Sequence, residues 1–205
     1  MPNVVPKIWA GETVVCIASG PSLTKVDCDF VRGKAKTIAI NNSYQLAPWA
    51  DVLYACDARW WKWHRGAKDF SGMKYALERR AGAMYPQVKV LRIGRPEGLS
   101  LDPMYLNTGK NSGYQAINLA VLMGATRILL LGYDMQKGPK GQMHWHPEHP
   151  MKTPHLYVEF RRRFQTLVDP LNAAGVAVIN CSRETALESF PRMSLESAFQ
   201  LERAA

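Results

Sequence analysis

Short apolar segments alternate with polar breaks along the chain, and this pattern predicts a buried parallel sheet. β-branched and apolar residues dominate segments that are too short for helices, at 13–18, 37–40, 51–56, 88–93, 127–131 and 176–180. Helical patterns are expected over 23–31, 115–123 and 154–171, with helical turns over 182–190 and 194–201. Strands that alternate with helices predict an α/β, Rossmann-like, doubly wound fold with a mostly parallel sheet.

The chain of 205 residues shows no linker, repeat or low-complexity run, which predicts a single domain over 1–205. Residues 1–12 form a lead-in without periodicity, and residues 136–153 form a polar, histidine-rich loop or lid, called the histidine loop below. No segment is long and apolar enough to span a membrane, and no secretion signal is evident. Four scattered cysteines without C-x-x-C spacing favour reduced thiols and a cytoplasmic protein.

Polar residues follow the predicted strands at the points where each strand ends. They are Ser19, Gly20, Asn41, Asn42, Asp57 and Asp134. Because the carboxyl ends of parallel strands share one edge of a sheet, these residues should line one crevice. Ser112 and Gly113 should join them at a helix start that Ser112 caps. Together they predict a nucleotide or phosphate site, with ordinary turns and caps as the alternative.

The formal charge of +9 favours an anionic partner such as a nucleotide, a sugar phosphate or nucleic acid. The segment Arg59–Arg65 interleaves basic and aromatic residues, so it could contact nucleic acid through stacking and phosphate contacts. We favour the alternative, an amphipathic helix whose tryptophans cover the sheet, because three tryptophans within four residues must face several directions.

The histidine loop supplies the candidate catalytic residues His144, His146 and His149. A histidine can deprotonate an acceptor hydroxyl near neutral pH, and His146 is the first choice because it lies between the other two. One alternative is solvated rings without a role. Another is a transition-metal site, for which H-x-H-x-x-H has ligand-like spacing, although we predict no metal ligands.

Neither G-x-G-x-x-G nor G-x-x-x-x-G-K-[ST] occurs, which argues against the usual dinucleotide and P-loop sites. Four other segments occur in order, namely Ile17–Leu23, Ile40–Tyr44, Asn111–Gly113 and Leu131–Asp134. With them the sequence resembles the DUF115 and bacterial sialyltransferase (GT-42) group, and many phage or prophage proteins look similar. The resemblance implies a nucleotide-sugar-dependent glycosyltransferase that needs no cofactor, in which the strand-end turns hold the nucleotide and a loop histidine is the base.

The chain departs from the pattern of this group at three places. The group's first turn often carries Asn-Gly where this chain has Ser19-Gly20, and its asparagine after the third strand is replaced by Asp57. Its tyrosines beyond the Gly-x-Asp block, which assist the leaving phosphate, are replaced by 135–137. Two alternatives therefore stay open. One is a DUF115-type pyrophosphokinase whose magnesium Asp57 and Asp134 could bind. The other is a non-catalytic protein that binds nucleotide or nucleic acid.

Overall fold

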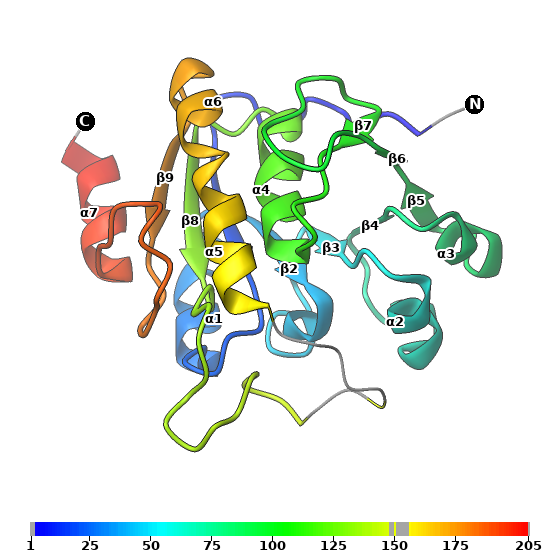
Figure 1. Cartoon of the computed structure of the whole chain (residues 1–205), viewed down its shortest axis with the longest axis horizontal. Helices are drawn as coiled ribbons and strands as arrows, with labels where there is room; N and C mark the ends of the chain where they lie inside the picture. The colour runs from blue at the N-terminus through cyan, green and yellow to red at the C-terminus, as the bar shows by residue number, and fades with distance from the viewer. Residues whose placement is uncertain (1–2, 148–149, 151–155, 205) are drawn as a thin grey trace.

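The computed structural model describes residues 3–147, 150 and 156–204, and its core is a seven-stranded sheet in which every strand pairing is parallel. Figure 1 shows the sheet at the centre of the molecule. The strands, in sheet order, are β5 (Val88–Val90), β4 (Met73–Ala76), β3 (Val52–Tyr54), β2 (Lys36–Ile40), β1 (Thr13–Ile17), β8 (Arg127–Leu131) and β9 (Ala177–Asn180). The sequence-based expectation of an α/β Rossmann-like fold is confirmed.

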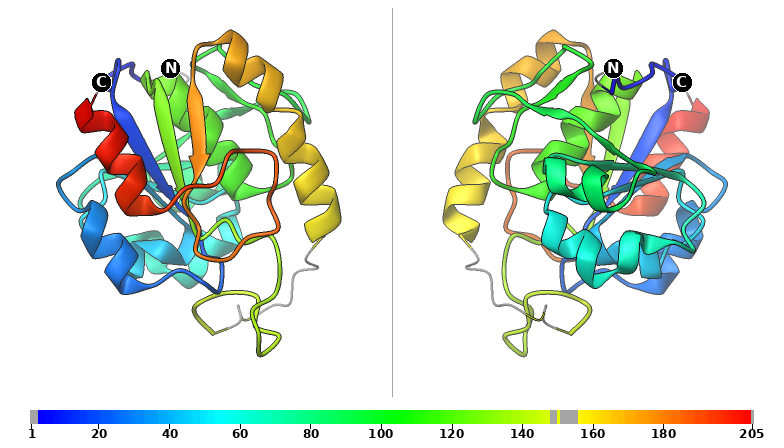
Figure 2. Two further views of the ribbon diagram at one scale, coloured as in Figure 1. Left: turned by 90° about the vertical axis from the view of Figure 1, so that its left-hand side faces the viewer. Right: turned by 90° about the vertical axis from the view of Figure 1, so that its right-hand side faces the viewer.

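Helices cover both faces of the sheet, as in a doubly wound fold (Figure 2). On one face lie α4 (Ser112–Met123), α5 (Tyr157–Gln165) and α6 (Val168–Ala173), and on the other α1 (Lys25–Val31), α2 (Ala58–Trp63), α3 (Arg79–Met84) and α7 (Leu195–Ala204). Two 3-10 helices, η1 (Asn41–Gln45) and η2 (Arg65–Ala67), extend the connections after β2 and α2. Alternate residues of β1 enter the two cores, Val14 and Cys16 on one side and Val15 and Ile17 on the other.

The strand order reverses at β1. From β1 the chain builds outward through β2 to β5, and it then returns to place β8 on the free side of β1. Cys16 and Ile17 pair with Leu130 and Leu131, so the carboxyl ends of β1 and β8 lie level with each other. Ligands of open α/β sheets bind at such a reversal, because the two connections diverge there and leave a crevice.

Strand composition explains which strands the sequence reveals. All five residues of β1 are buried, and β8 spans the predicted residues. The predicted strand over 88–93 is wrong as one unit, because β5 ends at Val90. Residues Arg92–Ile93 form β6, which pairs with β7 (Tyr105–Leu106) in a separate two-stranded sheet. Strand β4 was missed because Lys74 lies inside it, with an aliphatic stem that the sheet buries.

Two helix predictions need correction. The expected helix over 154–171 divides into α5 and α6, and its start lies outside the described residues. Pro170 lacks the N–H that a continuous helix would donate to Thr166, but it fits the first turn of a new helix. Residues 182–190 form no helix, since Thr185 Oγ1 bonds to the carbonyl oxygen of Tyr133 at 2.7 Å and Ala186 N to that of Asp134 at 2.8 Å.

Two further expectations concern the cysteines and membrane-spanning helices. Cys16, Cys28, Cys56 and Cys181 are all free thiols. Within the ranges that the structure describes, no helix combines the length and the apolar character that a bilayer crossing needs.

Candidate functional site

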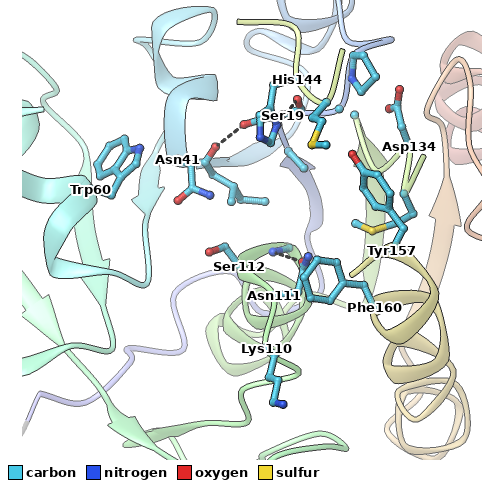
Figure 3. Close-up of a pocket in the computed structure, with 18 of the residues that line it drawn as sticks. Ser19, Asn41, Trp60, Lys110, Asn111, Ser112, Asp134, His144, Tyr157 and Phe160 are labelled. Carbon is cyan, nitrogen blue, oxygen red and sulfur yellow. Dashed lines mark hydrogen bonds between the residues drawn. The ribbon is translucent and has the colours of Figure 1, made fainter. Parts of the chain in front are cut away.

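A cleft of about 570 Å³ opens over the carboxyl edge of the sheet, at the reversal between β1 and β8 (Figure 3). This volume is in the range of small-molecule sites. The cleft is lined by seven of the eight residues predicted to contact a nucleotide, which are Ser19, Gly20, Asn41, Asp57, Ser112, Gly113 and Asp134. Residues that are far apart in sequence therefore meet at one edge, as the strand-end pattern suggested.

The turn after β1 is held by β8 and the loop that follows it. Gly20 N donates to the carbonyl oxygen of Gly132 at 2.8 Å. Asp134 accepts from Ser22 N at 2.7 Å and from Ser22 Oγ at 2.9 Å. A Cβ on Gly20 would lie 2.1 Å from Asp134 Oδ1 and 2.5 Å from the Gly132 oxygen, so no larger residue fits there. Glycine is needed here for close packing rather than for an unusual dihedral angle.

Asp134 is buried at the base of the cleft, with 1% of its surface exposed. Burial raises the pKa of this carboxyl to about 6, while the two hydrogen bonds from Ser22 oppose the shift. Because both carboxylate oxygens accept from Ser22, Asp134 mainly fixes the shape of the turn. Asp57, by contrast, is exposed at the start of α2.

The turn after β2 presents Asn41 to the cleft. Asn41 has a φ of 50°, a left-handed conformation that asparagine tolerates better than most residues. Ser43 lies behind it, and its hydroxyl donates to the carbonyl oxygen of Ala18 at 2.8 Å. This bond ties the ends of β1 and β2 together, so Asn41 is placed by the scaffold and not by a loose loop.

The amino terminus of α4 forms the opposite side of the cleft. Its cap is Asn111, not Ser112 as predicted, because Asn111 Oδ1 accepts from Gly113 N at 2.8 Å and from Tyr114 N at 3.2 Å. Ser112 is the first helical residue and lines the cleft. Its backbone N–H and hydroxyl are therefore the polar groups of this terminus that can meet a ligand.

Helix α2 both covers the sheet and contributes to the cleft, the two roles considered for Arg59–Arg65. Trp60 and Trp61 are 4% and 0% exposed, so the helix packs on the sheet as favoured. The helix also contributes to the site, since Arg59, Trp63 and an edge of Trp60 line the cleft. The cleft thus has an aromatic wall and a cation, which suits a base or sugar next to a phosphate.

The structure separates the three candidate histidines. His144 lines the cleft, and its Nδ1 lies 3.3 Å from the carbonyl oxygen of Ser19. His146, the first choice, is 8% exposed and stacks behind His144, with ring centroids 4.8 Å apart and planes at 4°. His149 lies outside the described residues. His144 is therefore the histidine of the described loop that faces the cleft.

Asn42 is the predicted nucleotide residue that the cleft does not include. It is 8% exposed, and it lies between Trp60, whose Nε1 donates to Asn42 Oδ1 at 2.7 Å, and His146, whose Nδ1 lies 3.3 Å from Asn42 Nδ2. The sequence placed Asn42 next to Asn41, but consecutive residues of a 3-10 helix point in different directions.

The described donor groups give the magnesium alternative little support, whereas the H-x-H-x-x-H site includes His149, outside the described residues, and stays a hypothesis. Within the part of the chain that the structure describes, no three His, Cys, Asp or Glu side chains gather as a metal cluster. Asp134 also directs both of its oxygens to Ser22, which leaves exposed Asp57 as a poor magnesium site alone.

Several cleft residues carried no signal in the sequence. They are Lys110, Met135, Gln136, Met143, Tyr157 and Phe160. Lys110 has a φ of 53° and pairs with Glu159 at 3.5 Å. Tyr157 begins α5, and burial raises its pKa, so its hydroxyl stays protonated at neutral pH. Only contacts made through the fold bring these residues together, and no local motif marks them.

Comparisons with known proteins agree with this architecture. No protein-family model and no curated protein sequence matches the chain. Among solved structures, the chain is similar to the sialyltransferase CstII from Campylobacter jejuni, solved in complex with a substrate analogue, cytidine-5′-monophosphate. The identity is 11% and the TM-score 0.56, over 90% of this chain and 86% of that one. This likeness establishes a sialyltransferase-like fold, while relation to DUF115 and a phage origin stay predictions.

Proposed function

We propose that this cleft binds the nucleotide of a nucleotide-sugar, and that the chain transfers the sugar as a sialyltransferase-like glycosyltransferase. The observation that carries the proposal is the convergence of strand-end polar groups, the start of α4 and His144 on one cleft at the reversal of strand order. The CstII structure, with cytidine-5′-monophosphate bound on a similar fold, supports this choice of ligand class.

In the proposed complex, Asn41 and Ser112 hydrogen-bond the nucleotide, while Trp63 stacks on its base or sugar. Arg59 and Lys110 bring positive charge to the same cleft for the phosphate. Polar contacts on both sides of an apolar wall are the usual composition of a nucleotide site, so each group has a plausible physical role.

His144 is the proposed general base. A carbonyl oxygen only accepts hydrogen bonds, so the contact with Ser19 favours the tautomer with the proton on Nδ1 and the lone pair on Nε2. In the reaction, Nε2 takes the proton of the acceptor hydroxyl as its oxygen attacks the anomeric carbon. The bond from that carbon to the phosphate oxygen breaks, and the nucleotide leaves with the electron pair.

Tyr157 is proposed to hydrogen-bond the leaving phosphate, the role that the resemblance gives to tyrosines just beyond the Gly-x-Asp block. Tyr157 follows the histidine loop in sequence but returns to the cleft at the start of α5. The pyrophosphokinase alternative finds less support, because the donor set around Asp134 does not suit magnesium. We therefore propose transfer without a resident metal.

Isothermal titration with CMP, CDP, UDP, ATP and GTP tests the binding step. We expect at least one of them to bind and to raise the melting midpoint. Asn41→Gly keeps the left-handed backbone but removes the amide, and should weaken binding about tenfold, the value of one good hydrogen bond. Asn172→Gly, at an exposed position of α6, is the matched control and should change affinity little. Absence of binding by all five nucleotides would overturn the proposal.

A further inference from the structure

The buried amide of Asn42 contacts both helix α2 and the histidine loop without reaching the cleft itself. One neighbour is Trp60, which comes from α2, and the other is His146, which comes from the histidine loop. Asn42 follows β2, whereas His146 lies in the connection that leaves β8, 104 residues further along the chain. A single side chain therefore links the scaffold to the loop.

Trp60 determines which way this amide faces. An indole N–H can only donate, so the Asn42 atom at 2.7 Å must be the oxygen, as placed. The NH₂ group is then directed at His146, with 3.3 Å between Asn42 Nδ2 and His146 Nδ1. Trp60 is itself held by stacking on His64, at 4.1 Å between ring centroids. The orientation of Asn42 is thus fixed by packed neighbours.

His146 Nδ1 has a second neighbour, the carbonyl oxygen of Pro147 at 2.6 Å. The two contacts require opposite states of Nδ1, a lone pair toward Asn42 and a proton toward Pro147. Pro147 is exposed, so water can satisfy its carbonyl, whereas the buried amide of Asn42 has no such access. At 2.6 Å a lone pair on Nδ1 would repel the Pro147 oxygen, so donation from Asn42 requires this carbonyl to turn toward water. In that arrangement the proton of His146 lies on Nε2.

His146 in turn supports His144. Their rings stack in parallel, and the backbone N of Trp145, between them, lies 3.3 Å from the same Ser19 oxygen that His144 Nδ1 contacts. The loop is thus attached to the end of β1 through Ser19 and to the turn after β2 through Asn42. Figure 3 shows His144 beside Ser19 at the cleft.

We propose that Asn42, oriented by Trp60, is a positioning residue that anchors His146 and so presents His144 to the cleft. The anchor is a property of the free protein, and only its effect on turnover rests on the proposed function. Loss of the anchor should release the loop and leave the nucleotide contacts in place.

Limited trypsin digestion measures the anchor directly, because Lys137 and Lys140 are exposed within the loop. Asn42→Ala should speed cleavage at these sites about tenfold, the effect of one buried hydrogen bond. Trp60→Phe should act in the same direction, because it keeps a ring but removes the donor that orients the amide. The control is Gln45→Ala, an exposed change in the same 3-10 helix, which should leave the rate unchanged. Unchanged cleavage in Trp60→Phe, or in a folded Asn42→Ala, would overturn the anchor.

Nitrogen-15 NMR of the histidine rings supplies a readout that general loosening would not imitate. In the parent, His146 should be the Nε2–H tautomer, and in Asn42→Ala it should change toward Nδ1–H as the Pro147 contact takes over. An Nδ1–H tautomer in the parent would overturn the role of Asn42. Both measurements use free protein, so failure of nucleotide binding cannot be mistaken for failure of the anchor.

The catalytic consequence is tested with CMP and the corresponding CMP-sugar. Asn42→Ala should keep CMP affinity within about twofold while turnover falls about tenfold, because only His144 is displaced. If affinity falls as much as turnover, Asn42 acts on the ligand and the positioning role is wrong. If the parent binds no CMP, the proposed function fails, and the digestion and NMR results still decide the anchor.

Discussion

Two parts of the cleft are built differently: the turn after β1, called the strand-end wall below, and the histidine loop, called the loop wall. The turn after β1 is fixed by short bonds, 2.8 Å from Gly20 N to the Gly132 oxygen and 2.7 Å from Ser22 N to Asp134. The histidine loop is attached by longer contacts, each 3.3 Å, from His144 and Trp145 to Ser19 and between Asn42 and His146. One wall thus belongs to the folded core, whereas the other can change without unfolding the protein. Substitutions in the two walls should therefore affect different measurements.

The largest expected effect is in the loop wall and concerns rate. His144→Ala removes the proposed base, and turnover of the nucleotide-sugar should fall about 10²–10⁴-fold. Nucleotide affinity and the melting midpoint should change little, since His144 is only half-buried. Steady-state kinetics, titration and thermal melts check the three quantities. An equal loss of affinity would instead make the loop a binding lid.

The next effect is in the strand-end wall and concerns stability. Gly20→Ala places a Cβ against Asp134 and the backbone oxygen of Gly132, and should lower the free energy of unfolding by about 3 kcal/mol. Gly141→Ala is the control in the loop wall. Its φ is 78° with nothing within 4 Å, so only the backbone strain of about 1 kcal/mol is expected. Equal costs in urea denaturation would contradict the contrast between the walls.

The smallest effect is the pH dependence that Asp134 gives to the strand-end wall. Its pKa of about 6 in the folded protein exceeds the ordinary value of 3.8, so the folded state holds this proton longer than the unfolded chain. Protonated Asp134 therefore adds at most about 3 kcal/mol to the free energy of unfolding. This contribution is complete below pH 3.8 and is lost as the pH rises through about 6.

Asp134→Asn tests this sign, because an amide can accept from Ser22 N and donate to Ser22 Oγ but cannot ionise. Urea denaturation of parent and variant between pH 4 and 8 should show the variant gaining relative stability as the pH rises. A difference that stays constant across this range would show that Asp134 titrates normally in the folded protein.

The elements that the sequence reveals are those whose hydrophobic pattern is uninterrupted. Strands β1 and β8 are recognisable because both of their faces are buried and every position after the first, Thr13 or Arg127, is apolar. Their polar ends were recognised for the same reason, since each apolar run stops abruptly. Lys74 conceals β4, and Pro170 divides a helix whose apolar pattern continues across the break. In both cases a single residue breaks or hides the hydrophobic pattern of the element.

The sequence by itself determined the class of fold, the edge of the sheet where polar groups gather and the glycine turn at Ser19-Gly20, because these depend on periodicity and on the order of strand ends. Only the tertiary structure decided that Asn42 points away from the cleft, that His144 and not His146 faces it, and that Tyr157 returns to it. These outcomes depend on side-chain directions and on contacts between residues far apart in the chain, which no local pattern encodes.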